Sequence, residues 1–242
     1  MKFWPVLFLS CLFLAVQAAA PEVEITAEPH HHQVFANDQV RIFYVEIPAH
    51  GETLMHWHRH DYVYINMGEA QISNEVKGKQ PVTVKLHDGD AGLISASFAH
   101  VAKNLGDIPF RNVDVELLHD DALRRLPTPS EDERALDILH GGTQQVLWVK
   151  DGVRASEFEL QQTGAIPSHA KARAMVLVAL NDLDLYLNDL RRHDAHEPAA
   201  PELHLKAGES KWMATGLVHP IVNAGKSVAK FVTLEMPAAA KH

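Results

Sequence analysis

Hydrophobic residues in this chain recur in short stretches, and turn-forming residues separate one stretch from the next. The β-branched and aromatic residues that are typical of strands concentrate at residues 40–47, 62–66, 82–86, 112–118, 146–149, 174–180, 183–187 and 228–235. Turn signals such as His87-Asp88-Gly89-Asp90 lie between these stretches. The pattern predicts an all-β chain of short antiparallel strands, and two barrels fit it best.

The spacing of individual residues indicates two copies of one plan. Val40-Arg41, Gly51 and His56 recur as Val153-Arg154, Gly164 and His169 with the same separations. Further along, Gly89, His100, Asn104, Gly106 and Glu116 recur as Gly208, His219, Asn223, Gly225 and Glu235. Matches in this order predict a tandem duplication, with repeats at 33–118 and 145–236. Because Glu116 and Glu235 recur at equal spacing, we expect them to have a structural role in both repeats.

The segment 119–144 between the repeats predicts a short helix. Ser130 and Glu133 have the spacing of a capping box, and Gly141-Gly142 would end the helix. A second insertion, at about 188–203, is rich in charge, proline and alanine and predicts a loop.

Residues 1–20 have the pattern of an export signal. Lys2 precedes an apolar run at 3–16, and Val16-Gln17-Ala18 offers small residues at a cleavage point. The run is short for a membrane span, although an uncleaved anchor is the alternative. Cys11, the only cysteine, lies in this segment. We therefore expect a protein exported to the periplasm or the medium, with no disulfide and no membrane segment after cleavage.

Charge and histidine content narrow the function. The chain of 242 residues has a net charge of −9 at pH 7 and no basic stripe, which argues against nucleic-acid binding. Its 17 histidines exceed ordinary usage. In MHWHRH at residues 55–60, His56 and His58 are two residues apart and would share one face of a strand. His100 from a distant strand can complete a three-histidine metal site that leaves positions open for substrate, water or oxygen. Solvated or core histidines that happen to alternate are the alternative.

These segments resemble the two motifs of the cupins, which are small β-barrel proteins. GETLMHWHRHDYVYINMG, Gly51 to Gly68, is similar to the first motif, G-x5-H-x-H-x3/4-E-x6-G. GDAGLISASFAHVAKN, Gly89 to Asn104, keeps the spacing of the second, G-x5-P-x-G-x2-H-x3-N, and GESKWMATGLVHPIVN does so from Gly208. The chain therefore resembles a bicupin, with two tandem cupin-type antiparallel β-barrels (double-stranded β-helix or jelly roll) and a short helical linker.

The resemblance implies that His56, His58 and His100 bind one divalent transition metal per chain. Imidazole ligands do not distinguish Fe, Mn, Ni, Zn and Cu. The glutamate of the first motif is missing: counting forward from His58 places Tyr62 or Val63 there, and counting back from Gly68 places Asp61 there. We favour a three-histidine site, with Asp61 as a candidate outer-shell or fourth ligand.

Neighbouring residues carry weaker expectations. His60 continues the alternation and is assigned equally to the pocket rim or to the metal. If Tyr62 faces inward, so do Tyr64 and Asn66. Trp57 should point away from the metal, into an interface between sheets. His30-His31-His32 is interpreted as a surface tract, with a metal binder or part of a first strand as alternatives.

The second repeat departs from the motif, because Lys171 stands where the second histidine belongs. An ammonium group beside a divalent cation would repel it, so we expect this repeat to hold no metal and to pack against the first. A site for an anion at Lys171 and His169 is the minority alternative.

The leading functional hypothesis is a metal-dependent enzyme acting on a small organic molecule, with oxygenase-type chemistry implied by the resemblance. Tyr62 or His60 would orient the substrate or move a proton. The alternatives are a non-catalytic protein that binds a small molecule or metal, and a purely structural protein. Cupins often pair by strand exchange, so the resemblance leaves a homodimer open as an alternative to a monomer.

Overall fold

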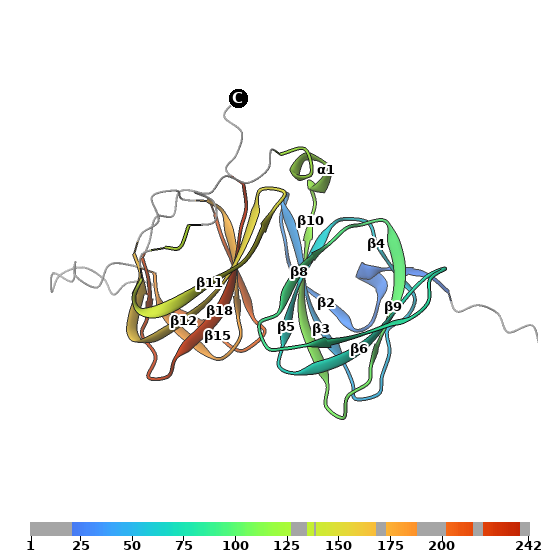
Figure 1. The fold of residues 1–242 in the computed structure, drawn as a ribbon, viewed down its shortest axis with the longest axis horizontal. Helices are drawn as coiled ribbons and strands as arrows, with labels where there is room; N and C mark the ends of the chain where they lie inside the picture. The colour runs from blue at the N-terminus through green and yellow to red at the C-terminus, as the bar shows by residue number, and fades with distance from the viewer. Residues whose placement is uncertain are drawn as a thin grey trace, which may run out of the picture.

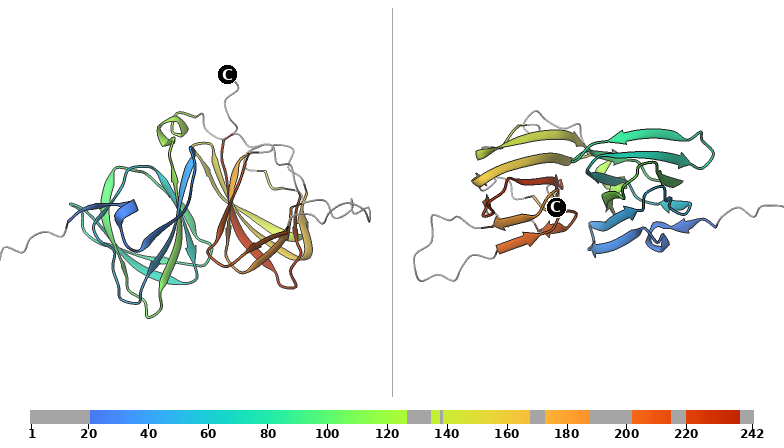
Figure 2. Two further views of the ribbon diagram at one scale, coloured as in Figure 1. Left: turned by 180° about the vertical axis from the view of Figure 1, so that it is seen from behind. Right: turned by 90° about the horizontal axis from the view of Figure 1, so that it is seen from below.

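The two halves of the chain form two β-barrels that lie side by side (Figures 1 and 2). The computed structural model describes residues 21–126, 135–137, 139–167, 173–187, 202–214 and 220–237. Strands dominate this part of the chain, so the all-β prediction is confirmed. Among the described residues, no helix has the length and apolar composition needed to cross a membrane. The predicted export signal at 1–20 lies outside them.

The first barrel consists of two five-stranded sheets, with the orders β1-β4-β9-β6-β7 and β2-β3-β10-β5-β8. The first sheet contains β1 (Val23–Glu24), β4 (His56–His58), β9 (Phe98–Asn104), β6 (Ala70–Val76) and β7 (Val82–Leu86). The second contains β2 (His31–Ala36), β3 (Val40–Ile47), β10 (Phe110–Leu117), β5 (Tyr62–Met67) and β8 (Ala91–Ile94). The turn η1 (Ile25–Ala27) connects β1 to β2. Strand β1 pairs in parallel with β4, so this barrel extends to residues before the predicted start at 33.

The second barrel is built around one long strand, β12 (Val153–Ile166). Its first half pairs with β18 (Ala229–Glu235) and its end pairs with β17 (Ile221–Asn223), so the sheet is continuous. The remaining strands are β11 (His140–Lys150), β13 (Met175–Ala179), β14 (Leu183–Tyr186), β15 (Glu202–Leu205) and β16 (Ser210–Met213). The strand order is β15-β14-β17-β12-β18-β13-β16, with β11 on β12.

The linker differs from its prediction. The short helix of this region is α1 (Asp120–Leu123), which lies before the proline-rich segment. Ser130 and Glu133 lie outside the described residues, residues 135–137 are not helical, and β11 begins at His140. Gly141-Gly142 therefore belongs to a strand and does not end a helix. A Cβ on Gly142 would lie 2.6 Å from the carbonyl oxygen of Glu159. This glycine lets β11 approach β12 closely.

An apolar core joins the barrels. β-branched and other apolar side chains from both halves form one buried cluster: Val40, Ile42, Val63, Ile65, Val113, Val115 and Leu117 from the first, and Val153, Ala155, Ala174, Val176, Val178, Leu180, Val232, Leu234 and Met236 from the second. The inward-facing residues of β5 lie on the other side of that strand, as the alternation predicted. The Trp148 indole N–H also donates to the Ala91 carbonyl across the boundary, at 2.9 Å.

Candidate metal centre

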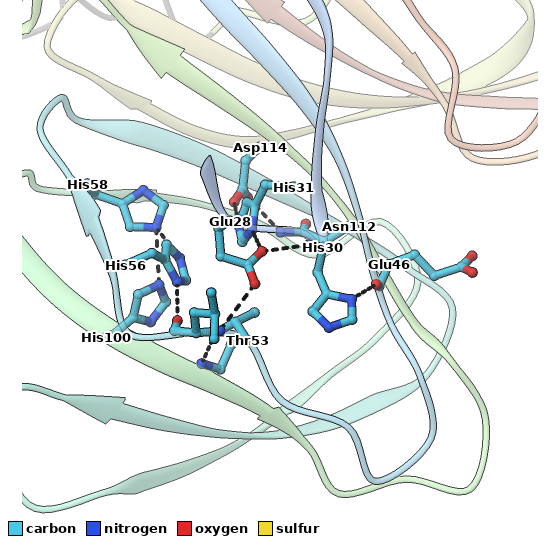
Figure 3. Close-up of polar contacts among 12 residues, drawn as sticks. Glu28, His30, His31, Glu46, Thr53, His56, His58, His100, Asn112 and Asp114 are labelled. Atoms are coloured by element: carbon cyan, nitrogen blue, oxygen red, sulfur yellow. Dashed lines mark hydrogen bonds and ion pairs between the residues drawn. The ribbon is translucent and has the colours of Figure 1, made fainter. Parts of the chain in front are cut away.

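Three histidines predicted from the sequence come together inside the first barrel. His56 and His58 are two residues apart on β4, so both rings point to the interior, and neither is exposed. Strand β9 pairs with β4 so that His100 lies directly opposite His56. Figure 3 shows the three rings gathered at one end of the barrel interior. Local strand geometry therefore assembles the cluster from a two-residue spacing and one cross-strand pairing.

The Nε2 atoms of these histidines converge. Nε2 of His58 lies 3.2 Å from Nε2 of His56 and 3.1 Å from Nε2 of His100. On the far side of each ring, Nδ1 of His56 is 2.9 Å from the Leu54 carbonyl, and Nδ1 of His100 is 2.7 Å from Oδ1 of Asn74. Both partners are acceptors, so each Nδ1 carries the hydrogen and each Nε2 keeps a free lone pair.

Burial keeps the three rings neutral. It lowers the pKa of His56 to about 4 and the pKa of His100 to about 3. Burial also lowers the pKa of His58 well below its ordinary value, and the neighbouring histidines add to the effect. A hydrogen on Nε2 of His58 can be donated to only one of the two facing lone pairs at a time, whereas a cation between the rings would bind all three Nε2 atoms. Two nitrogens each about 2.1 Å from one ion, at a right angle, lie about 3 Å apart, so the observed separations fit a transition-metal ion.

A fourth histidine, His31, lies beside this cluster, although the sequence favoured a surface tract for it. Candidate ligand atoms of His31, His56 and His58 all lie within 4.8 Å of one another, and all three residues are buried. His31 begins β2, and its ring centroid is 4.6 Å from that of His56. The surface-tract interpretation is therefore wrong for His31, and the alternative of a strand holds for it.

Two carboxylates hold His31. Its Nδ1 lies 2.6 Å from Oε2 of Glu28, which is itself buried, and its Nε2 lies 3.6 Å from Oδ2 of Asp114 (Figure 3). Burial opposes protonation of His31, but the hydrogen bonds to Asp114 and Glu28 outweigh it and raise its pKa to about 9. Glu28 also accepts hydrogen bonds from the backbone N–H groups of His30 and Leu54. His31 is thus a buried and firmly oriented residue.

Asp61 lies near the site but uses its carboxylate elsewhere. Its Oδ1 accepts a hydrogen bond from the Ala96 N–H at 2.6 Å and lies 2.6 Å from Nη1 of Arg124. These contacts give Asp61 a structural role beside α1. The side chain of His60 is one-third exposed, and its Nδ1 lies 3.7 Å from Oδ1 of Asp120. His60 therefore faces the linker helix rather than the three rings.

Tyr62 stacks on the candidate metal ligand His58, with ring centroids 4.0 Å apart and planes at 19°. Burial raises the pKa of its phenol well above the ordinary value, so the hydroxyl is a hydrogen-bond donor at neutral pH.

Tyr62 and Tyr64 both line a cavity of about 200 Å³ inside the first barrel. The polar part of its wall comprises His31, Tyr62, Tyr64, Asn74, His100, Asn112 and Asp114. The apolar part comprises Val45, Ile47, Ile72, Val84, Leu86, Ile94, Ala102 and Phe110.

Trp57 points away from the histidines, as expected, but it does not enter an interface between sheets. Its indole N–H donates to Glu22 at 3.0 Å, and the Arg59 guanidinium lies 4.3 Å from its ring centroid. The short strand β1 lies alongside β4 and brings Glu22 to this position. The correction follows from that pairing, because β1 gives Trp57 a charged surface neighbour.

In the second repeat, the residues at the motif positions, His169, Lys171 and His219, lie outside the described residues. The described residues of this repeat can still be compared with the first. Apolar side chains pack together inside the described part of the second barrel: Phe158, Leu160, Ile166, Leu177, Ala179, Leu183, Leu185, Leu205, Ile221, Ala229 and Phe231 form one buried cluster.

Comparison with known proteins supports the fold. Neither a family model nor a curated protein matches the sequence. Among solved structures, oxalate decarboxylase from Bacillus subtilis superposes with a TM-score of 0.57 at 9% identity, over 83% of this chain and 70% of that one. AerE from Microcystis aeruginosa gives 0.55 at 13% identity, over 87% and 99%. A cupin 2 conserved barrel domain protein from Leptotrichia buccalis gives 0.50 at 12% identity, over 85% and 88%. The chain therefore has the fold of cupin barrels, as its motifs predicted.

Proposed function

We propose that the protein is a metal-dependent enzyme that acts on a small organic molecule. His56, His58 and His100 would hold one divalent transition metal. The observation that carries the proposal is the convergence of three Nε2 atoms, with separations of 3.1 and 3.2 Å from His58 to the other two. Several structural neighbours are oxalate decarboxylases, and the Bacillus subtilis enzyme among them has Mn(II) centres, which supports metal chemistry in this fold.

In this proposal the three histidines bind the metal ion, and Tyr62 binds the substrate. A bound divalent ion would supply Lewis acidity and, if it is iron, redox chemistry toward oxygen. The three imidazoles add no negative charge, so they leave the full positive charge of the ion available to a substrate oxygen. Tyr62, with its protonated hydroxyl in the cavity wall, would donate a hydrogen bond that orients the substrate. An oxygenase-type reaction is the form we propose first.

The cavity favours a small and largely apolar substrate. The larger part of its wall is apolar, and neither lysine nor arginine is among the residues that line it in the described part of the chain. A second carboxylate of a substrate would face the buried Asp114 in this wall, and the imidazole of His31 is already held by Glu28 and Asp114, so the added charge would be costly to bury. Some structural neighbours act on oxalate, a dicarboxylate. For this cavity a dicarboxylate is a weaker candidate substrate than an uncharged molecule with one or two polar groups.

Metal content and oxygen consumption test the proposal. The untagged protein should contain close to one metal ion per chain by elemental analysis. It should consume oxygen with at least one member of a panel of small phenols, diketones and acids. His100→Ala should lose metal and turnover but keep the circular dichroism spectrum of the folded barrel. His50→Ala is the matched control, because His50 is an exposed histidine paired with Asp107.

The same experiment separates the alternatives. Stoichiometric metal without turnover of any panel member would favour a non-catalytic binding protein. Less than about half an equivalent of metal after reconstitution with each candidate ion would contradict the proposal. We also propose export through residues 1–20, which sequencing of the mature N-terminus would check.

A further inference from the structure

We infer that His31 is a fourth protein ligand of the ion held by His56, His58 and His100. The inference rests on the proposed metal site and adds to it a residue that lies outside both sequence motifs. It also assigns Glu28 as the carboxylate that orients this ligand. The site would then contain four imidazoles and one buried carboxylate hydrogen-bonded to a ligand.

Position is the first argument. His31 enters from β2, which belongs to the sheet opposite β4 and β9, so its ring approaches the cluster from another side. Its candidate ligand atom lies within 4.8 Å of those of both His56 and His58. The exposed fraction of the residue is 8%, and the centroid of its ring lies 4.6 Å from that of His56 and 6.2 Å from that of Phe43. A buried ring at this distance needs only a small shift to coordinate the same ion.

Orientation is the second argument. Nδ1 of His31 faces Glu28 at 2.6 Å, so Nε2, which lies 3.6 Å from Oδ2 of Asp114, is the nitrogen that would turn to a metal. Metal-binding histidines commonly hydrogen-bond through the other ring nitrogen to a carboxylate or a carbonyl. Leu54 connects two of the ligands, since its N–H donates to Glu28 at 3.1 Å and its carbonyl lies 2.9 Å from Nδ1 of His56. One short segment therefore orients both His31 and His56.

Charge is the third argument. Three neutral imidazoles leave a divalent ion uncompensated in a buried site, and the first motif lacks its glutamate. Asp61 is paired with Arg124 and cannot fill the gap without breaking that contact. Glu28 supplies a negative charge one hydrogen bond away from the ion, through the ring of His31. The hydrogen bond to Glu28 also makes the imidazole of His31 a stronger electron-pair donor to a metal ion.

The contact with Asp114 offers His31 an alternative role, in which it binds no metal. Oδ2 of Asp114 lies 3.6 Å from Nε2 of His31, so His31 can instead remain an imidazolium held between Asp114 and Glu28. A cation in that place would repel a divalent ion and leave a three-histidine site. The two roles differ in a countable quantity, the number of imidazoles bound to the metal.

Cobalt(II) provides the probe. The metal-stripped full-length protein would first be loaded with Co(II). X-ray absorption spectroscopy would then count the imidazole ligands of the ion, and competition with a chelator would measure the affinity for Co(II). We expect four imidazoles in the wild type and three in His31→Ala, with affinity about 10- to 100-fold weaker. Glu28→Gln should keep four imidazoles and weaken binding by a similar factor. His32→Ala, next in sequence but exposed on β2, should match the wild type.

Each outcome decides the inference. Three imidazoles in the wild type, with unchanged affinity in His31→Ala, would overturn it while leaving the proposed metal site intact. A wild-type protein that binds no cobalt would overturn both. If His31→Ala fails to fold by circular dichroism, the wild-type imidazole count and the folded Glu28→Gln variant still decide the question.

Discussion

Asn104 and Asn223 occupy matching positions in the two barrels and make the same contacts. The Asn104 amide donates to three backbone carbonyls at 2.7–3.2 Å, and the Asn223 amide donates to three at 2.8–3.1 Å. In both barrels Oδ1 accepts a hydrogen bond from a glycine N–H two residues later, at 2.9 Å: Gly106 in the first and Gly225 in the second. The motif asparagine therefore closes the same turn in both barrels.

An arginine–glutamate pair repeats in the same way. Arg41 and Glu116 are cross-strand partners joined at 3.1 Å, and Arg154 and Glu235 are partners joined at 3.2 Å. The structural role expected for the two glutamates is thus present in both barrels.

The inward positions of the same strands differ. Asn112 and Asp114 of β10 line the cavity of the first barrel. At the matching spacing, β18 has Phe231 and Thr233, and Phe231 stacks on Phe158 with centroids 5.3 Å apart. The duplicated fold is held by residues at turns and strand pairs, and these are kept in both copies. The cavity of the first copy depends on inward side chains such as Asn112 and Asp114, and β18 of the second copy has Phe231 and Thr233 at these positions.

The largest expected effect is on the packed interior of the second barrel. Phe231→Ala should lower the free energy of unfolding by about 3–5 kcal/mol, because it leaves a cavity among buried apolar side chains. Asn112→Ala, the matching change in the first barrel, should cost about 1–2 kcal/mol, because its side chain already faces a cavity. Urea denaturation measures both. Equal losses would contradict the claim that only one interior is filled.

A substitution that copies the second repeat into the first should abolish metal binding. His58→Lys places an ammonium where Lys171 stands in the other motif, and we expect metal affinity to fall about 100-fold or more, about 2.7 kcal/mol. The measurement is chelator competition with Co(II). His87→Lys serves as the control, since His87 is exposed and paired with Glu69. Retained affinity in His58→Lys would show that the lysine does not explain the difference between the repeats.

The turn asparagines should behave alike. Asn104→Ala and Asn223→Ala each leave three backbone carbonyls without this donor, so each should lower the free energy of unfolding by about 1–3 kcal/mol. Urea denaturation of the metal-free protein is the measurement. A loss confined to one variant would mean that the two turns are not equivalent.

The smallest expected effect lies at the boundary between the barrels. Trp148→Phe removes the N–H that donates to the Ala91 carbonyl but keeps most of the apolar ring. We expect a loss of about 1 kcal/mol in the free energy of unfolding. Trp212→Phe is a useful comparison, because Trp212 stacks on Phe35 across the same boundary and keeps an aromatic ring after substitution.

The sequence predicted what local periodicity and spacing determine. The stretches at 40–47 and 82–86 coincide with β3 and β7, and the two-residue spacing of His56 and His58 placed both rings inside. His31 could not be recognised in that way, since three consecutive histidines resemble a polar tract. Only the position of β2 against the barrel turns the middle one inward. The prediction of a helix end at Gly141-Gly142 failed for a related reason. Gly142 is needed because β12 passes close to its backbone, and that neighbour is not visible in the local sequence.

The apolar cluster between the barrels has a thermodynamic consequence. Its members come from both halves and are almost completely buried, so neither half can unfold without exposing the face of the other. Heating should then give one cooperative transition rather than two. A ligand that binds only the native state raises the stability of everything that unfolds with its site. An ion held in the first barrel would therefore protect the second from heat without touching it.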